Sequence, residues 1–259
     1  MNAFVTGGSR GIGRAIVTKL AAEGYGVAFT FAGNKAAAEE TVELAQKAAA
    51  ATGSEGNKSD GGVAPKFVAY QMDVRDADAV EKTIEAAIDE FEDIGALVNN
   101  AGLVRDNALA FMSNEEWDDV IAANLSGPFY TIRSFLLHFI SNRLGRIVNI
   151  SSLSARGTSG QANYAAAKSG LVGLTKSVAK EYGRKGVTAN IVTVGYVPTD
   201  MTKDHMTGTL REYWLAHCPG GRVGTAEEIA GMVHYLTTEP AAFLTGEEIA
   251  ISGGLTYAP

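Results

Sequence analysis

The stretch TGGSRGIG, residues 6–13, is rich in glycine and lies close to the N-terminus. It follows the short apolar run AFV, residues 3–5, and precedes apolar residues that recur at helical spacing between positions 12 and 20. A strand, a glycine-rich turn and a helix in this order expose the N–H groups of a helix N-terminus, which suit a phosphate. The stretch therefore predicts a phosphate-binding turn. An ordinary glycine-rich turn is the alternative, because the spacing Gly7-x-x-x-Gly11-x-Gly13 is not G-x-G-x-x-G.

Strand-like and helix-like segments alternate along the rest of the chain. This alternation predicts an α/β fold with a doubly wound parallel sheet of the Rossmann type, with ligands at the carboxyl ends of the strands. We expect residues 1–259 to form one domain, with a flexible loop at about 51–65 and a substrate lid at about 195–221. The further strands are expected at 27–31, 67–70, 96–98, 146–150, 188–194 and 248–252, and the helices at 36–51, 77–91, from about 115, 163–183 and 226–237.

Composition restricts the class of protein. The chain has 259 residues, 22 Lys plus Arg against 29 Asp plus Glu, and a net charge of −7, which disfavours general nucleic-acid binding. The single cysteine, Cys218, permits no internal disulfide and indicates a reducing compartment. No signal peptide is visible, and no apolar run reaches the ~18 residues of a membrane span. We therefore expect a cytoplasmic protein without a metal site.

Four side chains are candidates for chemistry. Tyr164 and Lys168 are four residues apart in a predicted helix, so they share a face, and a nearby ammonium should lower the pKa of the phenol. Ser152 ends a strand twelve residues before Tyr164 and can donate to a carbonyl oxygen. Asn124 lies inside a predicted helix, where it is either satisfied at a helix interface or directed at the ligand crevice. Taken alone, a Tyr-x-x-x-Lys pair is common by chance.

Together these segments resemble the short-chain dehydrogenase/reductase family over essentially the whole chain. Within that family, GRIVNISS and GQANYAAAKSGLVGLTKSVAKE are most similar to the β-ketoacyl-[acyl-carrier-protein] reductases, and the acetoacetyl-CoA reductases are close relatives. The matching residues, in order, are Thr6-Gly7-x-x-x-Gly11-x-Gly13, Asn99-Asn100-Ala101-Gly102, Asn124, Ser152 and Tyr164-x-x-x-Lys168.

The resemblance implies a nicotinamide cofactor and a role for each candidate. Tyr164 would donate the proton to a carbonyl, and Lys168 would hold the nicotinamide ribose and lower the pKa of Tyr164. Ser152 would hydrogen-bond the substrate oxygen, and Asn124 would hold a water of the proton relay. The family's usual assembly implies a homotetramer built on the long helix and the Tyr–Lys helix.

The second strand favours NADPH over NADH. An NAD enzyme usually has an acid at the end of this strand, whereas Phe31 stands there. Arg10 and Lys35 can pair with a 2′-phosphate, and Asn34 can add a hydrogen bond, although Lys35 also fits a solvated helix start. The remaining cofactor contacts are expected at Gly7, Ser9, Gly11, Ile12, Gly13, Asp73, Val74, Asn100, Ala101, Gly102, Tyr164, Lys168, Val197 and Thr199.

The leading hypothesis is therefore NADPH-dependent reduction of a 3-oxoacyl thioester on an acyl carrier protein, in fatty-acid or polyketide-type synthesis. Reduction of acetoacetyl-CoA, or oxidoreduction of a free ketone or secondary alcohol, is the first alternative. A non-catalytic NADP-binding sensor or scaffold is the second. Arg143 and Lys185 fall where related enzymes have carrier-docking basic residues, but cations are also favoured at helix C-termini.

Overall fold

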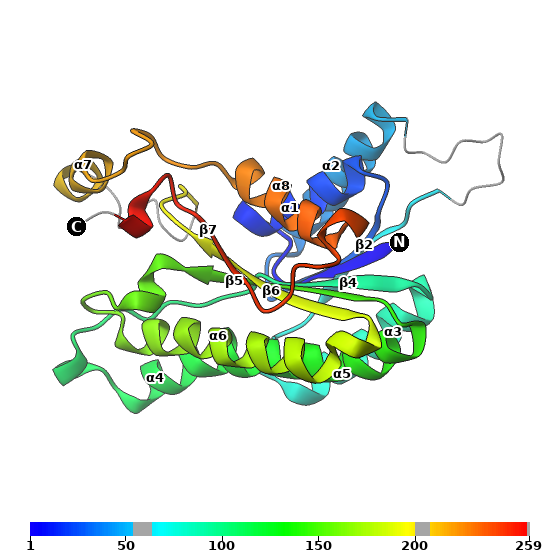
Figure 1. Cartoon of the computed structure of the whole chain (residues 1–259), viewed down its shortest axis with the longest axis horizontal. Helices are drawn as coiled ribbons and strands as arrows, with labels where there is room; N and C mark the ends of the chain where they lie inside the picture. The colour runs from blue at the N-terminus through cyan, green and yellow to red at the C-terminus, as the bar shows by residue number, and fades with distance from the viewer. Residues whose placement is uncertain (54–63, 200–207, 258–259) are drawn as a thin grey trace.

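A seven-stranded parallel sheet lies at the centre of the computed structural model, which describes residues 1–53, 64–199 and 208–257 (Figure 1). The strand order is β3-β2-β1-β4-β5-β6-β7. The strands are β1 (Asn2–Val5), β2 (Gly26–Phe31), β3 (Phe67–Gln71), β4 (Ile94–Asn99), β5 (Gly145–Ser152), β6 (Val187–Val194) and β7 (Glu248–Ile251). The α-helices are α1 (Gly11–Ala22), α2 (Lys35–Ala51), α3 (Ala77–Phe91), α4 (Asn114–Ile121), α5 (Gly127–Asn142), α6 (Ala162–Tyr182), α7 (Gly208–Ala216) and α8 (Ala226–Thr237).

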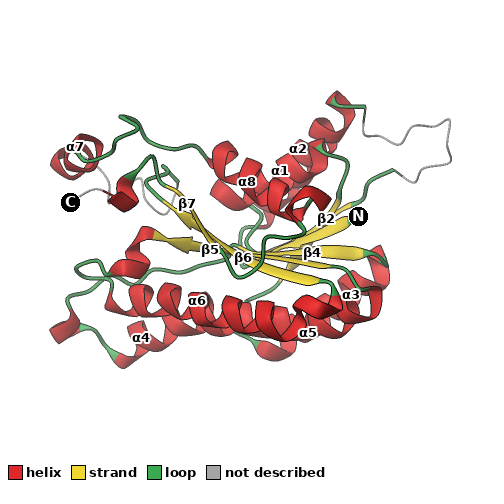
Figure 2. Ribbon diagram, in the orientation of Figure 1, coloured by secondary structure: helices red, strands yellow, loops and turns green. Residues whose placement is uncertain are grey.

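Helices cover both faces of the sheet (Figure 2). α1, α2 and α8 pack on one face, while α3, α5 and α6 pack on the other. Strand residues alternate between the two layers, so that Val27 and Phe29 join the first core and Ala28 joins the second. Because both faces are covered, β2 and β6 are buried at every position.

The order of the strands creates the crevice. β1 pairs with β2 on one side and with β4 on the other, so the chain changes direction across the sheet at this point. The connections after β1 and β4 therefore lead to opposite faces of the sheet. This leaves the carboxyl ends of the two strands open to a ligand. The glycine-rich turn follows β1, and the stretch Asn100–Gly102 follows β4.

A buried hydrogen-bonded network joins the elements around this crevice. The side-chain amide of Asn99 in β4 donates to Oδ1 of Asn149 in β5 at 2.9 Å. Thr131 of α5 donates to Oδ1 of Asn99 at 2.6 Å, and Nδ2 of Asn149 donates to Thr175 of α6 at 2.8 Å. All four side chains are buried, so the network fixes two strands and two helices against one another.

The expected long helix after position 115 is interrupted. α4 ends at Ile121, a π-helical segment η2 (Ala122–Ser126) follows, and α5 begins at Gly127. Pro128 has no N–H to donate to the carbonyl of Asn124 four residues earlier, which disfavours a regular helix here. Within α4, Trp117 is 39% exposed whereas Val120 is buried.

The two expected irregular segments are described in part. The connection 195–221 contains the helix α7, which the sequence did not predict, and residues 200–207 of it lie outside the described residues. Of the expected loop 51–65, residues 54–63 also lie outside them. Among the helices of the described chain, none combines the length and the apolar character that crossing a membrane requires.

The buried network generates a stability prediction. Replacing Asn149 by alanine removes two of its hydrogen bonds and leaves Asn99 and Thr175 without these partners in the core. We expect the free energy of unfolding to fall by about 2–4 kcal/mol, as measured by urea denaturation. Ile147→Val in the same strand is the control, with an expected loss of about 1 kcal/mol. Equal losses in the two variants would show that the network contributes nothing beyond packing.

Candidate active site

The turn between β1 and α1 has room only for glycine at its centre. Gly7 and Gly11 have φ values of +68° and +54°, and a Cβ on Gly13 would lie 2.0 Å from the carbonyl oxygen of Gly7. The backbone is thus free of side chains where it faces the crevice, and the first turn of α1 carries no acidic residue. These features fit a bound phosphate group.

Arg14, which lies outside the predicted motif residues, stabilises this turn. Its guanidinium donates to the carbonyl oxygen of Ser9 at 2.8 Å and forms an ion pair with Glu40 of α2 at 2.8 Å. Hydrogen bonds also hold the turn that follows β4 against the glycine-rich turn. The hydroxyl of Thr6 accepts from the backbone N–H groups of Asn100 and Ala101 at 3.0 Å each, and Nδ2 of Asn100 donates to the carbonyl of Gly7 at 3.0 Å. Asn100 therefore holds the two turns together.

A cleft of about 650 Å³ opens at the carboxyl ends of the strands. Its volume is in the range of small-molecule sites. Most residues expected to contact a cofactor or substrate line this one cleft. They are Gly7, Ser9, Arg10, Gly11, Ile12, Gly13, Asn34, Asp73, Val74, Asn100, Ala101, Gly102, Ser152, Tyr164, Lys168, Val197 and Thr199.

Asn34 and Lys35, the two phosphate contacts predicted after β2, differ in position: Asn34 lines the cleft and Lys35 does not. Residues 31–34 line the cleft and include no carboxylate, and Oδ1 of Asn34 accepts from the N–H of Ala37 at 3.0 Å to cap α2. Lys35 is not among the lining residues. Its side chain is 79% exposed and its ammonium lies 3.7 Å from Glu39. The structure therefore places Lys35 at the solvated start of α2, and contact with a cofactor would require its side chain to leave Glu39.

Asn124 is fully buried in the π-helical segment and is not among the residues that line the cleft, but its Oδ1 lies against Gly102, which does line it. Its Nδ2 donates to the carbonyl oxygens of Leu103 at 2.7 Å and Val120 at 2.9 Å. Its Oδ1 accepts no hydrogen bond within the described structure. A Cβ on Gly102 would lie 2.7 Å from this oxygen and 3.9 Å from Nζ of Lys168, so the same small space adjoins both groups. A buried acceptor without a partner is unfavourable and indicates a functional position.

Tyr164 and Lys168 lie on the face of α6 that lines the cleft, and Ser152 approaches from the end of β5. Nζ of Lys168 donates to the carbonyl of Ile150 at 2.9 Å and lies 5.5 Å from the centre of the Tyr164 ring. Burial lowers the pKa of Lys168 to about 8. Burial also raises the pKa of Tyr164 to about 12, although a hydrogen bond with Ser152 acts in the opposite direction. The expected lowering of the Tyr164 pKa is thus wrong, because desolvation dominates and the ammonium lies over the ring, bonded to Ile150.

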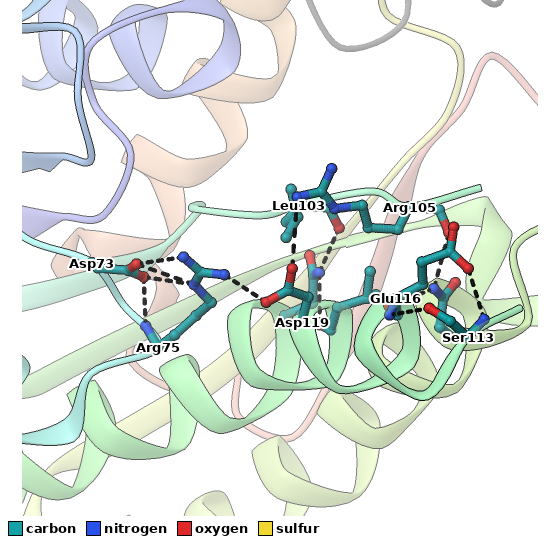
Figure 3. Close-up of polar contacts among 10 residues, drawn as sticks. Asp73, Arg75, Leu103, Arg105, Ser113, Glu116 and Asp119 are labelled. Atoms are coloured by element: carbon teal, nitrogen blue, oxygen red, sulfur yellow. Dashed lines mark hydrogen bonds and ion pairs between the residues drawn. The ribbon is translucent and has the colours of Figure 1, made fainter. Parts of the chain in front are cut away.

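Two arginines of the cleft wall were missed (Figure 3). Arg75 binds both carboxylate oxygens of Asp73 and also pairs with Asp119 of α4 at 2.6 Å. Arg105 lies 3.6 Å from the same Asp119. The Arg75 guanidinium lowers the pKa of Asp73, which keeps this carboxylate ionised. Both arginines lie close to predicted motifs in the sequence, but only the fold shows that they converge on Asp119.

Arg143 and Lys185 lie at the other end of the sheet. Arg143 caps the C-terminus of α5 just before β5, and Lys185 precedes β6. The eight residues of β5 span about 25 Å at ~3.3 Å per residue, and Ser152 ends this strand at the cleft. The two basic residues are therefore remote from the cleft of their own chain.

Comparison with known proteins agrees with this geometry. Residues 7–256 match a family model described as Enoyl-(Acyl carrier protein) reductase. The chain is 42% identical over 255 residues to the 3-oxoacyl-[acyl-carrier-protein] reductase FabG of Staphylococcus aureus, covering 98% of this chain and 97% of that protein. Identity to FabG of Escherichia coli is 39%, with 98% and 96% covered.

A solved structure gives the same result. A doubly substituted variant of a Serratia marcescens short-chain dehydrogenase/reductase matches with a TM-score of 0.86 and 36% identity, covering 98% of this chain and 97% of that one. The chain belongs to the short-chain dehydrogenase/reductase family. The family and the α/β sheet predicted from the sequence are thereby confirmed. The matches name two different substrates. The family model is named for an enoyl substrate, and the FabG relatives are named for a 3-oxoacyl substrate.

Burial of the Lys168 ammonium is expected to lower the free energy of unfolding of this short-chain dehydrogenase/reductase. The pKa of Lys168 is about 8 when folded against 10.5 as the ordinary value, so below pH 8 both states carry the charge and its burial is unfavourable. Lys168→Met should raise the free energy of unfolding at pH 7 by about 1–3 kcal/mol. The difference should shrink between pH 8 and 10.5, where the wild-type lysine is neutral only when folded.

Urea denaturation at pH 7 and at high pH measures both effects. Lys176→Met, at an exposed position of the same helix, is the matched control and should change stability by less than about 0.5 kcal/mol. A Lys168→Met protein that is less stable than the wild type at pH 7 would contradict the desolvation argument.

Proposed function

We propose that this protein is an NADPH-dependent reductase that converts 3-oxoacyl thioesters on an acyl carrier protein to 3-hydroxyacyl thioesters, in fatty-acid or polyketide-type synthesis. The observation that carries the proposal is the convergence of Ser152, Tyr164 and Lys168 on one cleft with the glycine-rich turn. The names of the similar FabG proteins support the substrate class. We further propose that residues 1–259 form one reductase domain, that residues 195–221 act as the substrate lid, and that the enzyme works in the cytoplasm.

The residues of the cleft fit a nicotinamide dinucleotide. The side-chain-free backbone at Gly7, Gly11 and Gly13 suits a pyrophosphate at the N-terminus of α1. Arg10 lines the same cleft as residues 31–34, which include no carboxylate to oppose a 2′-phosphate. In the proposed binding mode, Asp73 and Val74 border the adenine of the cofactor, while Val197 and Thr199 border its nicotinamide. When bound, the cofactor supplies the hydride.

The chain's own residues supply the proton and the orientation. With a pKa near 12, the hydroxyl of Tyr164 is protonated at neutral pH and is available to a carbonyl oxygen. Ser152 offers a second donor to the same oxygen. Lys168, whose Nζ lies 5.5 Å from the centre of the Tyr164 ring, would hold the ribose of the nicotinamide nucleotide, as the family resemblance implies. The unpaired Oδ1 of Asn124 beside Lys168 is suited to hold a water that returns the proton.

Reduction of an enoyl thioester is a second candidate, because the matching family model is named for that reaction. We favour the 3-oxo group, since two hydroxyls in the cleft can donate to one carbonyl oxygen as negative charge develops there. Three other functions remain as alternatives: reduction of acetoacetyl-CoA, oxidoreduction of a free ketone or secondary alcohol, and cofactor binding without turnover. The activity assay described below distinguishes each of them from the proposed reaction.

A carrier protein docked near Arg143 and Lys185 would lie at the amino ends of β5 and β6, opposite its own chain's cleft. In the homotetramer that we propose, such a carrier would deliver its substrate to the cleft of a neighbouring subunit. The two cations at this end of the sheet fit carrier docking. They fit equally well a structural role, in which each stabilises the C-terminus of a helix.

Spectrophotometric NADPH oxidation tests the proposed function. Acetoacetyl groups are offered on carrier protein, on CoA and as a free ester, with crotonyl-CoA as the enoyl substrate. We expect the highest kcat/KM with the carrier-bound 3-oxo substrate and no turnover of the crotonyl group. Tyr164→Phe should lower kcat by about 10²- to 10⁴-fold while leaving NADPH binding intact. Turnover of crotonyl-CoA alone would establish the enoyl activity instead, and NADPH binding without any turnover would establish a sensor.

Arg10 is expected to set the cofactor preference. Arg10→Ala should lower kcat/KM for NADPH by about 10- to 100-fold, because a charge-assisted hydrogen bond to a phosphate is lost. The value for NADH should change little, which steady-state kinetics with both cofactors will show. Lys35→Ala is the control and should alter neither value, since Lys35 pairs with Glu39 outside the cleft. Equal losses for the two cofactors would remove Arg10 from phosphate recognition.

A further inference from the structure

The residue before Tyr164 is a fully buried asparagine. Oδ1 of Asn163 accepts from the backbone N–H of Tyr164 at 2.7 Å. Its Nδ2 donates to two carbonyl oxygens of distant segments, those of Arg105 at 3.0 Å and Glu116 at 3.0 Å. Both donor hydrogens of the side-chain amide are therefore used, and each of them reaches across to another part of the chain.

One of these partners belongs to a short segment that we call the strap, residues 103–107. The strap follows β4, and two of its members, Leu103 and Arg105, line the cleft. Asn124 donates to the carbonyl of Leu103 at 2.7 Å, while Asn163 donates to the carbonyl of Arg105. Two buried asparagines, one in the π-helical segment and one in α6, thus hold the same strap two residues apart.

Two exterior contacts complete the attachment of the strap to α6. The carboxylate of Asp106 accepts from Nε2 of Gln161 at 2.9 Å, and the N–H of Asn107 donates to the carbonyl of Gly160 at 2.9 Å. Tyr164 is the third residue of α6, and Gln161 at its N-cap makes no side-chain capping bond. The first turn of a helix lacks internal partners for its N–H groups, so its position depends on such external contacts.

We propose that Asn163 is a positioning residue, which sets the Tyr164 hydroxyl relative to Asn124 by fastening the first turn of α6 to the strap. The inference rests on the proposed function of Tyr164 as proton donor. It assigns to Asn163 no contact with substrate or cofactor. A displacement of about 1 Å in a reacting group can lower a rate by 10²-fold, so loss of this fastening should act on kcat.

Asn190 in β6 provides a matched control. It is also a buried asparagine, at 1% exposed, and its Nδ2 donates to the carbonyl of Leu244 at 2.8 Å. Its Oδ1 accepts from the N–H of Glu247 at 3.1 Å, so it likewise ties a distant segment to its own element. It does not line the cleft. Asn190→Ala therefore removes the same chemical group at the same depth without touching the strap.

The experiment compares Asn163→Ala with Asn190→Ala in the full-length protein. Asn163→Ala should lower kcat for the acetoacetyl thioester by about 10- to 100-fold, with KM and NADPH affinity unchanged within about threefold. Asn190→Ala should lose similar stability in urea but keep kcat within about threefold. Similar kcat values in the two variants would overturn the positioning role. If Asn163→Ala does not fold, Asn163→Ser, which keeps a small polar group, takes its place.

Hydrogen exchange provides a readout that does not need turnover. Asn163→Ala should speed exchange both in the strap and in the first turn of α6, whereas Asn190→Ala should change neither. Unchanged exchange in these two segments would overturn the fastening itself. A wild-type protein that turns over no substrate would instead refute the proposed function, while the exchange data would still decide whether Asn163 fastens the strap.

Discussion

The hydrogen bond between the side chains of Asn99 and Asn149 is the contact on which the site depends. It joins β4 to β5 in the core, and its two ends are bonded to Thr131 of α5 and Thr175 of α6. β4 leads into the turn that fastens the glycine stretch, β5 ends at Ser152, and α6 carries Tyr164 and Lys168. Because these amides are buried, a shift of register would leave several polar groups unpaired, and the network thereby specifies one arrangement of the elements that carry the chemistry.

The site itself is organised at the expense of stability. Lys168 is buried with its ammonium on a backbone carbonyl, and Asn124 keeps a buried oxygen without a partner in the described structure. A well-packed apolar core would place neither group there. Both belong to the buried groups at the cleft that ligand binding can satisfy, whereas Nε of Arg146, buried without a partner in the described structure, lies at the other end of β5.

The parts of the site that could be predicted are those set by local spacing. The turn at Gly7–Gly13 and the helical pair of Tyr164 and Lys168 follow from short-range geometry, and the alternation of strands and helices fixed their place at one edge of the sheet. Side-chain direction and solvation do not follow from spacing. Lys35 pairs with Glu39 one turn later in α2 rather than lining the cleft. Burial reverses the expected pKa shift of Tyr164, because that shift depends on neighbours brought together by the fold.

Arg75, Asn163 and Asn124 share one partner, the short helix α4, which the sequence did not reveal. Arg75 binds Asp119 of α4 from the wall beside Asp73, and Asn163 binds the carbonyl of Glu116 in the same helix. Asn124, in the π-helical segment that continues α4, binds the carbonyl of Val120. α4 is therefore held from the β3 side of the cleft, from the helix of Tyr164 and from its own C-terminal continuation. Since each of these contacts joins residues more than forty positions apart or depends on the irregular turn at Asn124, only the assembled fold could disclose that α4 connects the cofactor wall to the proton donor.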